Sequence, residues 1–202
     1  LDNVTQVTSP VLNGVATANA AIEVWDTFNG LHVKVGHATA AANGQWSLTL
    51  ASQGEGAHHY VVKELASDGT VARSSAPTVV IVDTTAPAAA SAPVMTTASD
   101  SGMLSNDGVT NVQTPTFTGQ ADGHAWVNIY RGGSTLVGKV QADGEGVWTY
   151  KVPASLADGN YTLTARQMDA AGNESVASTG AALTVDSAVA VPKLHGVLAW
   201  SN

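Results

Sequence analysis

The sequence predicts an all-β protein that contains two tandem β-sandwich domains joined by a short and stiff linker. Apolar and polar residues alternate in short runs such as Ala21–Trp25, Trp126–Tyr130 and Tyr161–Ala165. A period of about two residues is typical of β-strands. Turn-forming pairs such as Asn43-Gly44 and Asp158-Gly159 separate the runs, at the spacing of about 8 to 12 residues that is typical of a β-sandwich.

Much of the sequence also occurs twice, which indicates two domains of one kind. The matching segments are Asp2–Thr5 with Asp107–Thr110, Pro10 with Pro115, Gly14 with Gly119, Val35-Gly36 with Val137-Gly138, Gly44–Trp46 with Gly146–Trp148, Gly56 with Gly159, and Val82-Asp83 with Val185-Asp186. The offset of about 103 residues is too long for a solenoid repeat and fits a whole small domain. We therefore expect one domain at residues 1–83 and a second at residues 84–186.

The second repeat contains the pattern of a complete seven-stranded sandwich. Its strands are expected near residues 90–98, 115–120, 125–131, 135–142, 146–152, 159–168 and 176–185. The first repeat has the same pattern for the last six of these strands. Its first strand would lie before residue 1, and the missing strand would expose a sheet edge.

The linker between the repeats is expected at Asp83–Pro87. Pro87 fixes its own backbone and favours an extended conformation at Ala86, so the linker is stiff rather than a flexible tether. Residues 187–202 follow the second repeat without repeating the linker sequence. They are a tail or the start of a further unit.

The composition excludes several classes of function. The chain has a net charge of −8 and no cysteine, so nucleic acids and anionic membranes are poor partners and disulfides are absent. No apolar run reaches the roughly 18 residues that membrane insertion takes. The chain contains neither a Gly-x-Ser-x-Gly nor a His-Glu-x-x-His motif, and we expect no enzymatic activity.

Seven short motifs occur in a fixed order along the chain. They are Val82–Pro87, Ser99–Gly102, Asp107–Asn111, Thr114–Gly119, Ala142–Trp148, Leu156–Tyr161 and Asp169–Asn173. In this order the motifs resemble the bacterial immunoglobulin-like repeats of giant surface adhesins, which are secreted through type I systems and often carry calcium-binding RTX repeats. The first repeat departs from the pattern at Ala66–Thr70, which replaces Asp-Ala-Ala-Gly-Asn.

The resemblance implies two tandem immunoglobulin-like β-sandwich domains in a non-catalytic extender region of a bacterial cell-surface adhesin. Such a region lies outside the cell and serves adhesion and biofilm formation. Its partners would be neighbouring immunoglobulin-like domains of the same long chain, while a host or matrix ligand would be bound by domains elsewhere. The resemblance further implies that calcium at the domain poles stiffens the array.

Ca²⁺ is the cofactor that the sequence leads us to expect, because carboxylate oxygens on loops are its usual ligands. The candidate ligands are Asp100, Asp107 and Asp186 at the far pole of the second repeat, with Asp158 as a weaker candidate, and Asp2, Asp83, Asp169 and Asn173 near the junction. The alternative is that these residues form turns in which their side chains accept hydrogen bonds from nearby N–H groups. We favour this alternative for Asp26, Asp68, Asp122, Asp143 and Asp158.

The histidines and aromatic residues allow further hypotheses. His58 and His59 are neighbours on one expected strand, so they face opposite sides and cannot share a metal ion. Trp46 and Trp148 occupy equivalent positions and are expected in the two cores. For Trp25, Phe28 and Tyr60 we favour core packing. The alternative is an aromatic platform for sugar rings, which would make the chain a carbohydrate-binding module appended to a secreted protein. A further alternative is that the first repeat binds a partner protein.

Overall fold

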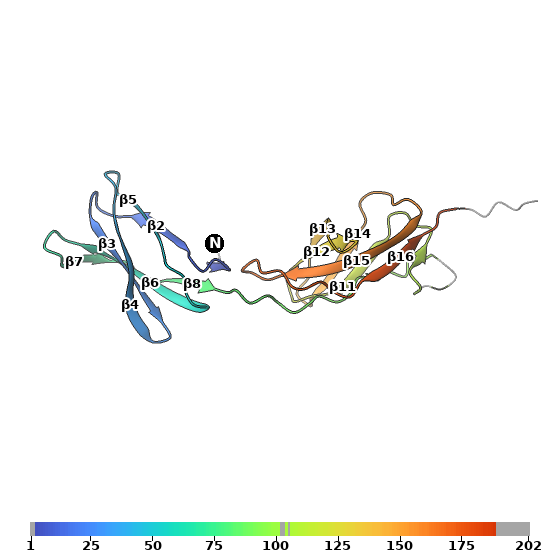
Figure 1. Cartoon of the computed structure of the whole chain (residues 1–202), viewed down its shortest axis with the longest axis horizontal. Helices are drawn as coiled ribbons and strands as arrows, with labels where there is room; N and C mark the ends of the chain where they lie inside the picture. The colour runs from blue at the N-terminus through green and yellow to red at the C-terminus, as the bar shows by residue number, and fades with distance from the viewer. Residues whose placement is uncertain (1–2, 102–103, 105, 189–202) are drawn as a thin grey trace, which may run out of the picture. The chain divides into compact units, whose positions relative to one another are not determined.

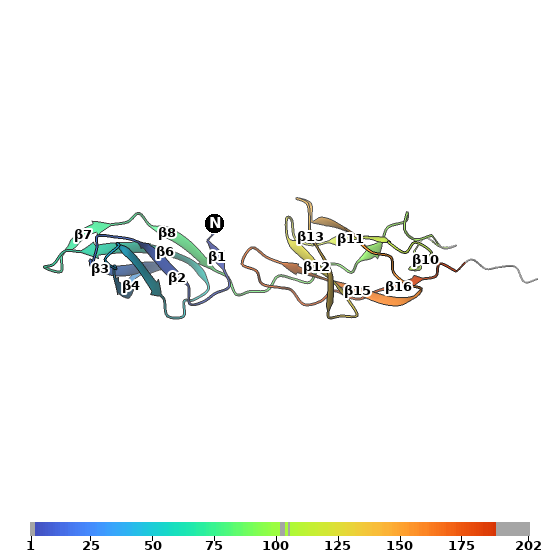
Figure 2. The same ribbon diagram turned by 90° about the horizontal axis from the view of Figure 1, so that it is seen from above.

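The computed structural model describes residues 3–101, 104 and 106–188, and these residues form sixteen β-strands and no helix. The predicted all-β class is therefore confirmed. The chain is divided into two compact units, whose strands can be followed in Figures 1 and 2. Unit one consists of Leu1–Pro87 with Met168–Glu174, and unit two consists of Ala88–Gln167 with the residues from Ser175 onward.

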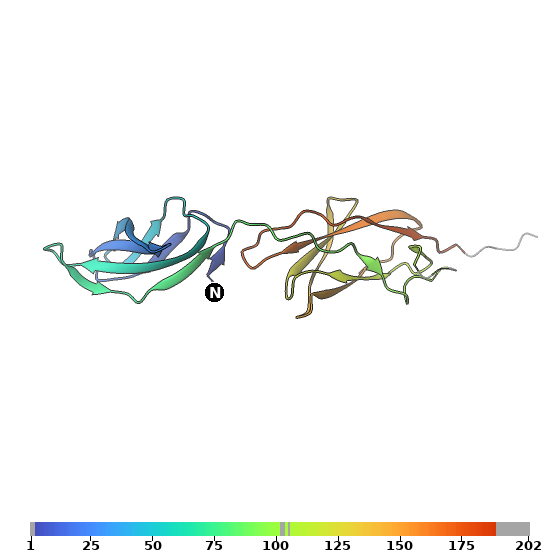
Figure 3. The ribbon, with the colours of Figure 1, turned by 90° about the horizontal axis from the view of Figure 1, so that it is seen from below.

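Unit one contains a large and a small sheet. The large sheet has the order β1-β8-β6-β3-β4, and β7 pairs with β6 as well. Its strands are β1 (Val4–Thr5), β3 (Ala21–Phe28), β4 (Leu31–Thr39), β6 (Gly56–Leu65), β7 (Val71–Ser74) and β8 (Thr78–Val82). The small sheet consists of β2 (Val11–Val15) and β5 (Gln45–Thr49). The short strand β1 is parallel to β8, beside which it lies in Figure 3.

Unit two has a similar plan, with one strand more in its small sheet and no counterpart of β7 among the described residues. The large sheet has the order β10-β16-β15-β12-β13, and the small sheet has the order β14-β11-β9. The strands are β9 (Val94–Met95), β10 (Val109–Thr110), β11 (Thr116–Gln120), β12 (Trp126–Arg131), β13 (Thr135–Gln141), β14 (Val147–Lys151), β15 (Gly159–Met168) and β16 (Ala181–Val185). As in unit one, the first strand of the large sheet is parallel to the last strand of the unit.

The two repeats share local details, so residues can be matched between them. A register shift interrupts the antiparallel pairing directly before Trp25 in the first repeat and directly before Tyr130 in the second. Each repeat therefore contains a bulge at the same point of the sheet. The residues that follow the bulge correspond as well, so Asp26 occupies the place of Arg131.

Each repeat contains one core tryptophan, as the sequence predicts. The side chains of Trp46 and Trp148 are 7% and 1% exposed. Each ring lies against a glycine of the neighbouring strand, Gly14 or Gly119, where a Cβ atom would approach the ring to 2.8 Å or 2.4 Å. These glycines are needed because no larger residue leaves room for the ring.

Each of the seven strands predicted in the second repeat is present. Two of them are much shorter than predicted, and the others agree to within one or two residues. The predicted strand at 90–98 is reduced to Val94–Met95, because Pro93 has no N–H for a sheet ladder. The predicted strand at 176–185 begins at Ala181. Before that point the Ser175 and Ser178 hydroxyls, rather than backbone carbonyls, accept hydrogen bonds from the N–H groups of β15.

Candidate functional site

The acidic residues predicted at the far pole of the second repeat lie around Thr110 of β10. The Thr110 hydroxyl donates a hydrogen bond to the carbonyl oxygen of Ser99, which holds Asp100 next to β10. The N–H of Asp186, directly after β16, donates to the carbonyl oxygen of Thr110 at 2.9 Å. Asp107 lies in the turn that leads into β10. The structure thus brings these three acids to the same end of unit two.

Asp100 carries a buried oxygen atom without a partner. The residue is 5% exposed, and its Oδ1 atom has no hydrogen-bond partner within the part of the chain that the structure describes. A buried polar atom without a partner is unfavourable, and it indicates a donor, a water molecule or a cation. Since Ca²⁺ prefers oxygen ligands of this kind, the chemistry at Asp100 fits the predicted cofactor.

Asp107 and Asp186 instead use a carboxylate oxygen in a local turn. Oδ1 of Asp107 accepts a hydrogen bond from the N–H of Val109 at 3.0 Å, and Oδ1 of Asp186 accepts one from Ala188 at 3.2 Å. These bonds match the turn interpretation. No group of three or more acidic or histidine side chains that could hold a metal ion occurs among the described residues. Calcium binding at this pole therefore stays a prediction.

Asp158 also has a structural partner. Its Oδ1 atom accepts hydrogen bonds from the hydroxyl and the N–H of Ser187, at 2.6 Å and 3.0 Å. The bond from the hydroxyl, with the N–H bond adding to it, lowers the pKa of the Asp158 carboxyl. Asp158 thus ties the loop before β15 to the residue that follows Asp186.

The other group of predicted ligands is found in unit one. The Asn173 side-chain amide donates to Oδ2 of Asp169 and to the carbonyl oxygen of Asp83, both at 2.9 Å. The N–H of Asn173 donates to Oδ1 of Asp169, and Oδ1 of Asp83 accepts from Thr85. The Asn173 side-chain amide thus links Asp169 to Asp83, and calcium binding by these residues stays a prediction. Asp2 lies outside the described residues.

A polar pair that the sequence analysis missed is buried in unit one. Nδ1 of His58 lies 2.6 Å from Oδ2 of Asp26, and Nε2 of His58 lies 2.8 Å from the carbonyl oxygen of Gly54. The other Asp26 oxygen accepts a hydrogen bond from the N–H of His59 at 3.0 Å. Asp26 and His58 are 2% and 1% exposed. The expectation that Asp26 is a turn residue is wrong, because Asp26 lies within β3 and points into the core.

The surroundings of His58 give the pair a structural role. The imidazole stacks on the ring of Phe28 at 4.2 Å between centroids, and the ring of Tyr60 stacks at 5.8 Å. Burial, with the Asp26 charge adding to it, raises the pKa of the Tyr60 hydroxyl. Because Nε2 of His58 faces a backbone carbonyl, the pair has no hydroxyl or thiol to activate as a nucleophile. The strand alternation that places Ile22 and Val24 in the core could have revealed Asp26.

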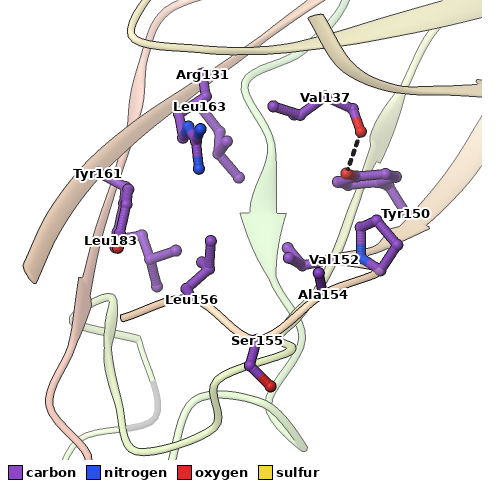
Figure 4. A pocket seen from close by; sticks show the side chains of 11 residues that line it. Arg131, Val137, Tyr150, Val152, Ala154, Ser155, Leu156, Tyr161, Leu163 and Leu183 are labelled. Carbon is purple, nitrogen blue, oxygen red and sulfur yellow. Dashed lines mark hydrogen bonds between the residues drawn. The ribbon is translucent and has the colours of Figure 1, made fainter. Parts of the chain in front are cut away.

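The second repeat has different residues at these positions. Arg131 stands in place of Asp26 and Tyr161 in place of His58, and the guanidinium carbon lies 5.9 Å from the centre of the tyrosine ring. These two residues border an apolar pocket of about 240 Å³ (Figure 4). Its tyrosine hydroxyls already donate to backbone carbonyl oxygens, Tyr150 to Val137 and Tyr161 to Ala157. The pocket is smaller than the roughly 300 to 1,000 Å³ of ordinary ligand sites.

The aromatic platform proposed for the first repeat does not form. Phe28 and Tyr60 contact His58 on the inner side of the large sheet, and Tyr60 belongs to the buried core. Trp25 lies on the outer side, where it stacks on His32 at 5.1 Å. The Lys63 ammonium lies 4.1 Å from the centre of the Trp25 ring. This alternative is excluded because Trp25 and Phe28 lie on opposite faces of β3, at an odd and an even position, and the core packing that we favoured holds for Tyr60.

Known families and structures were compared with the chain. A family model described as bacterial Ig-like domain matches residues 1–84 and again residues 87–187. No curated protein matches the sequence significantly. The fibronectin(III)-like modules of Clostridium thermocellum CbhA are similar in structure, with 16% identity, a TM-score of 0.50, and coverage of 96% of this chain and 94% of theirs. At this identity the likeness shows the fold alone.

Two further solved structures are similar to this chain over most of its length. One is the BSP domain of a biofilm associated protein, with 16% identity, 92% of this chain covered and a TM-score of 0.36. The other is a tetra-tandem repeat in the extending region of a large adhesion protein, with 21% identity, 92% covered and a TM-score of 0.37. This chain spans 29% of the first structure and 47% of the second.

Proposed function

Because the chain belongs to the bacterial Ig-like domain family, we propose that it is a non-catalytic region that extends a bacterial cell-surface adhesin. The observation that carries this proposal is the tandem arrangement, in which two repeats of one family occupy residues 1–84 and 87–187. Domains in series add length to a chain without any need for a binding site in each domain. The partners of the region are then the neighbouring Ig-like domains of the same long polypeptide.

The polar groups inside the two units support a structural role. The Asp26–His58 pair of unit one is enclosed by aromatic rings and bonded to the backbone. The pocket beside Tyr161 in unit two is small and mostly apolar. Neither feature combines a nucleophile with a base that activates it, as covalent catalysis requires.

As an adhesin extender, the region lies outside the cell at the bacterial surface and acts in adhesion and biofilm formation. Among the described residues, no helix has the length and apolar character that membrane crossing takes.

A glycan array and a pull-down with surface and matrix proteins test the extender function against the binding-module alternative. We expect the 202-residue chain to be silent in both, because the aromatic residues of unit one do not share an exposed face. Saturable binding of a glycan or of a purified matrix protein would contradict the proposal and favour a binding module.

We further propose that calcium binds at the Asp100 end of unit two and stiffens the region. The unpartnered Oδ1 atom of Asp100 supports this proposal, together with the nearby Asp107 and Asp186. When bound, Ca²⁺ would neutralise carboxylates that otherwise repel one another. Small-angle scattering of the chain in calcium and then in EDTA tests the stiffening. A scattering profile that does not change between the two conditions would contradict it.

A further inference from the structure

The pocket beside Tyr161 in unit two has an apolar floor and a mouth at the surface. The floor contains Leu183, Leu163 and Tyr150, which are 1%, 3% and 6% exposed. The mouth is bordered by exposed residues, one of which is Arg131. The volume of about 240 Å³ is too small for a drug-sized ligand. Since an apolar cavity of about 150 Å³ is large enough for benzene, the pocket has room for one aromatic ring with a short substituent.

Unit one has an aromatic side chain of its own at the corresponding place. His58 stands in the place of Tyr161, and the residues after the shared bulge set Phe28 in the place of Gly133, in the turn after β12. The Phe28 ring stacks on His58 at 4.2 Å and would lie 3.1 Å from a Cβ atom on Gly56. In unit two a Cβ atom on Gly133 would have no neighbour within 4 Å. A ring that unit one supplies from its own sequence is thus missing beside Tyr161.

Two tyrosine rings in the wall of the pocket are held in place by hydrogen bonds. The Tyr150 hydroxyl donates to the carbonyl oxygen of Val137 at 2.7 Å, and the Tyr161 hydroxyl donates to that of Ala157 at 2.8 Å. The Tyr150 ring also lies directly against β13, where a Cβ atom on Gly138 would clash with it. Figure 4 shows the two rings on opposite sides of the pocket. Because both rings are held in this way, neither fills the space between them, and the pocket is preformed.

A positive charge lies at the mouth of the pocket. The guanidinium carbon of Arg131 is 5.9 Å from the centre of the Tyr161 ring. Burial raises the pKa of the Tyr150 hydroxyl, and the nearby Arg131 charge opposes this effect. Neither of the ion pairs found among the described residues involves Arg131, whereas Asp26, at the same position of unit one, pairs with His58. In a chain of net charge −8, an arginine that no described acidic side chain neutralises is available to an anion.

We propose that the pocket beside Tyr161 binds a small aromatic monocarboxylate, whose ring enters the pocket and whose carboxylate is held by Arg131. The apolar floor favours the ring, because burial of apolar surface is favourable and contacts between aromatic rings add to it. A guanidinium and a carboxylate form two parallel hydrogen bonds, which fix the orientation of the ligand. Such a ligand is neither a glycan nor a protein. The proposal therefore goes beyond the extender function and leaves the two tests of that function unchanged.

Phenylacetate is the probe that tests the proposal, and methyl NMR signals of the whole 202-residue chain are the readout. For a ligand of about ten non-hydrogen atoms we expect a Kd of about 1 mM. The methyl signals of Leu156, Leu163 and Leu183, which line the pocket, should shift until they saturate and should show NOEs to the ligand ring. Phenylacetamide has nearly the same shape without the charge, and it should bind about tenfold more weakly.

Two variants separate the role of Arg131 from a general effect of charge. Arg131→Gln removes the cation at the mouth of the pocket and should weaken phenylacetate binding about tenfold. The matched control is Lys151→Gln, which removes the same charge from an exposed residue of β14 that does not line the pocket. This control should change the Kd by less than about twofold, because solvent screens a distant charge. Both replaced residues are exposed, so both variants are expected to fold, and their amide spectra check this.

Three results would overturn the proposal. The first is unchanged leucine methyl signals in phenylacetate at about 20 times the expected Kd, where a site would be almost saturated. The second is equal affinity for phenylacetate and phenylacetamide, or an affinity for phenylacetate that Arg131→Gln does not change. The third is a set of NOEs between these methyl groups and a second copy of the chain without ligand, because that copy would then fill the pocket. Saturable shifts that depend on the ligand charge and on Arg131 are the expected result.

Discussion

At the residue scale, the contact between Asp26 and His58 shows how one repeat of a tandem protein acquires its own core chemistry. Both residues occupy inward positions of their strands, where the second repeat has Arg131 and Tyr161. Two polar side chains are tolerated in the core because each bonds to the other and to the backbone. Removal of one partner leaves the other buried without a partner.

We therefore predict that Asp26→Ala lowers the free energy of unfolding of unit one by about 3 to 5 kcal/mol. The double variant Asp26→Leu with His58→Phe is expected to restore most of this loss, because it removes both polar groups. Urea unfolding, followed through the Nε1–H NMR signals of Trp46 and Trp148, measures each unit separately. The control is His59→Ala, a change on the exposed side of β6. Equal effects of Asp26→Ala and His59→Ala would contradict the prediction.

The second prediction at the residue scale concerns calcium binding at Asp100. If its buried Oδ1 atom binds calcium, a few millimolar calcium stabilises unit two by about 1 to 2 kcal/mol, for a Kd of about 10⁻⁴ to 10⁻³ M. The melting temperature of unit two then rises by about 4 to 8 °C per kcal/mol. Asp100→Ala should abolish this rise, while Asp122→Ala, a change at an exposed residue, should keep it. No rise in the unmodified chain, measured by calorimetry against EDTA, would exclude calcium binding at this end.

Individual residues were harder to predict from the sequence than the strands that hold them. The core positions of Trp46 and Trp148 followed from their repetition, because a shared aromatic residue reflects a shared core. The Asp26–His58 pair could not be seen as a pair, since its members are 32 positions apart and meet only through the β3–β6 register. The acidic candidates were brought to one end of unit two as the topology suggested, yet most of them bond to nearby backbone groups.

At the element scale, the packing of the small sheet in each unit depends on a glycine of one strand that lies against a tryptophan ring of the neighbouring strand. The β11 glycine, Gly119, is enclosed by Trp148 on one side and by Ser91 on the other. At the β2 glycine, Gly14, the three nearest atoms all belong to Trp46, and the residue borders a hollow of about 370 Å³. The same substitution should therefore have different effects in the two repeats.

We predict that Gly119→Ala destabilises unit two by about 1 to 3 kcal/mol through overpacking, and that Gly14→Ala destabilises unit one by less. The added methyl group is closer to the ring at Gly119, at 2.4 Å against 2.8 Å, and has no open side to move toward. Gly144→Ala is the control, because its nearest neighbour would be 3.6 Å away. The melting temperatures of the two units measure the effect. A larger loss of stability for Gly14→Ala than for Gly119→Ala would contradict the prediction.

Strands were predicted well where alternation and turn residues were both present. The strand expected at 159–168 is found as β15 with the same bounds, because Gly159 starts it and its inner residues are apolar. The strand β10 was missed, since two residues carry no periodic pattern and their partner β16 is distant in sequence. The last predicted strand is shorter because side-chain hydroxyls replace backbone carbonyls as hydrogen-bond acceptors. No periodic pattern in the sequence marks such a replacement.

At the scale of the whole molecule, the repeated sequence folds into two copies of one plan, and the described residues of the two copies form core clusters of different size. Both copies place a short parallel strand next to the last strand of the large sheet. Among the described residues, unit two has three strands in its small sheet and a core cluster of twelve residues, against two strands and six residues in unit one. Since buried apolar area is the main source of stability, unit one should be the weaker domain.

We predict that a chain pulled at its two ends unfolds in two steps, and that unit one unfolds first at the lower force. An extended chain spans about 3.4 Å per residue, so the steps release at most about 28 nm for the first repeat and about 35 nm for the second. Optical tweezers resolve the two lengths. A single step for the whole chain, or a longer step that comes first, would contradict the inference that the smaller core cluster of unit one makes it the weaker domain.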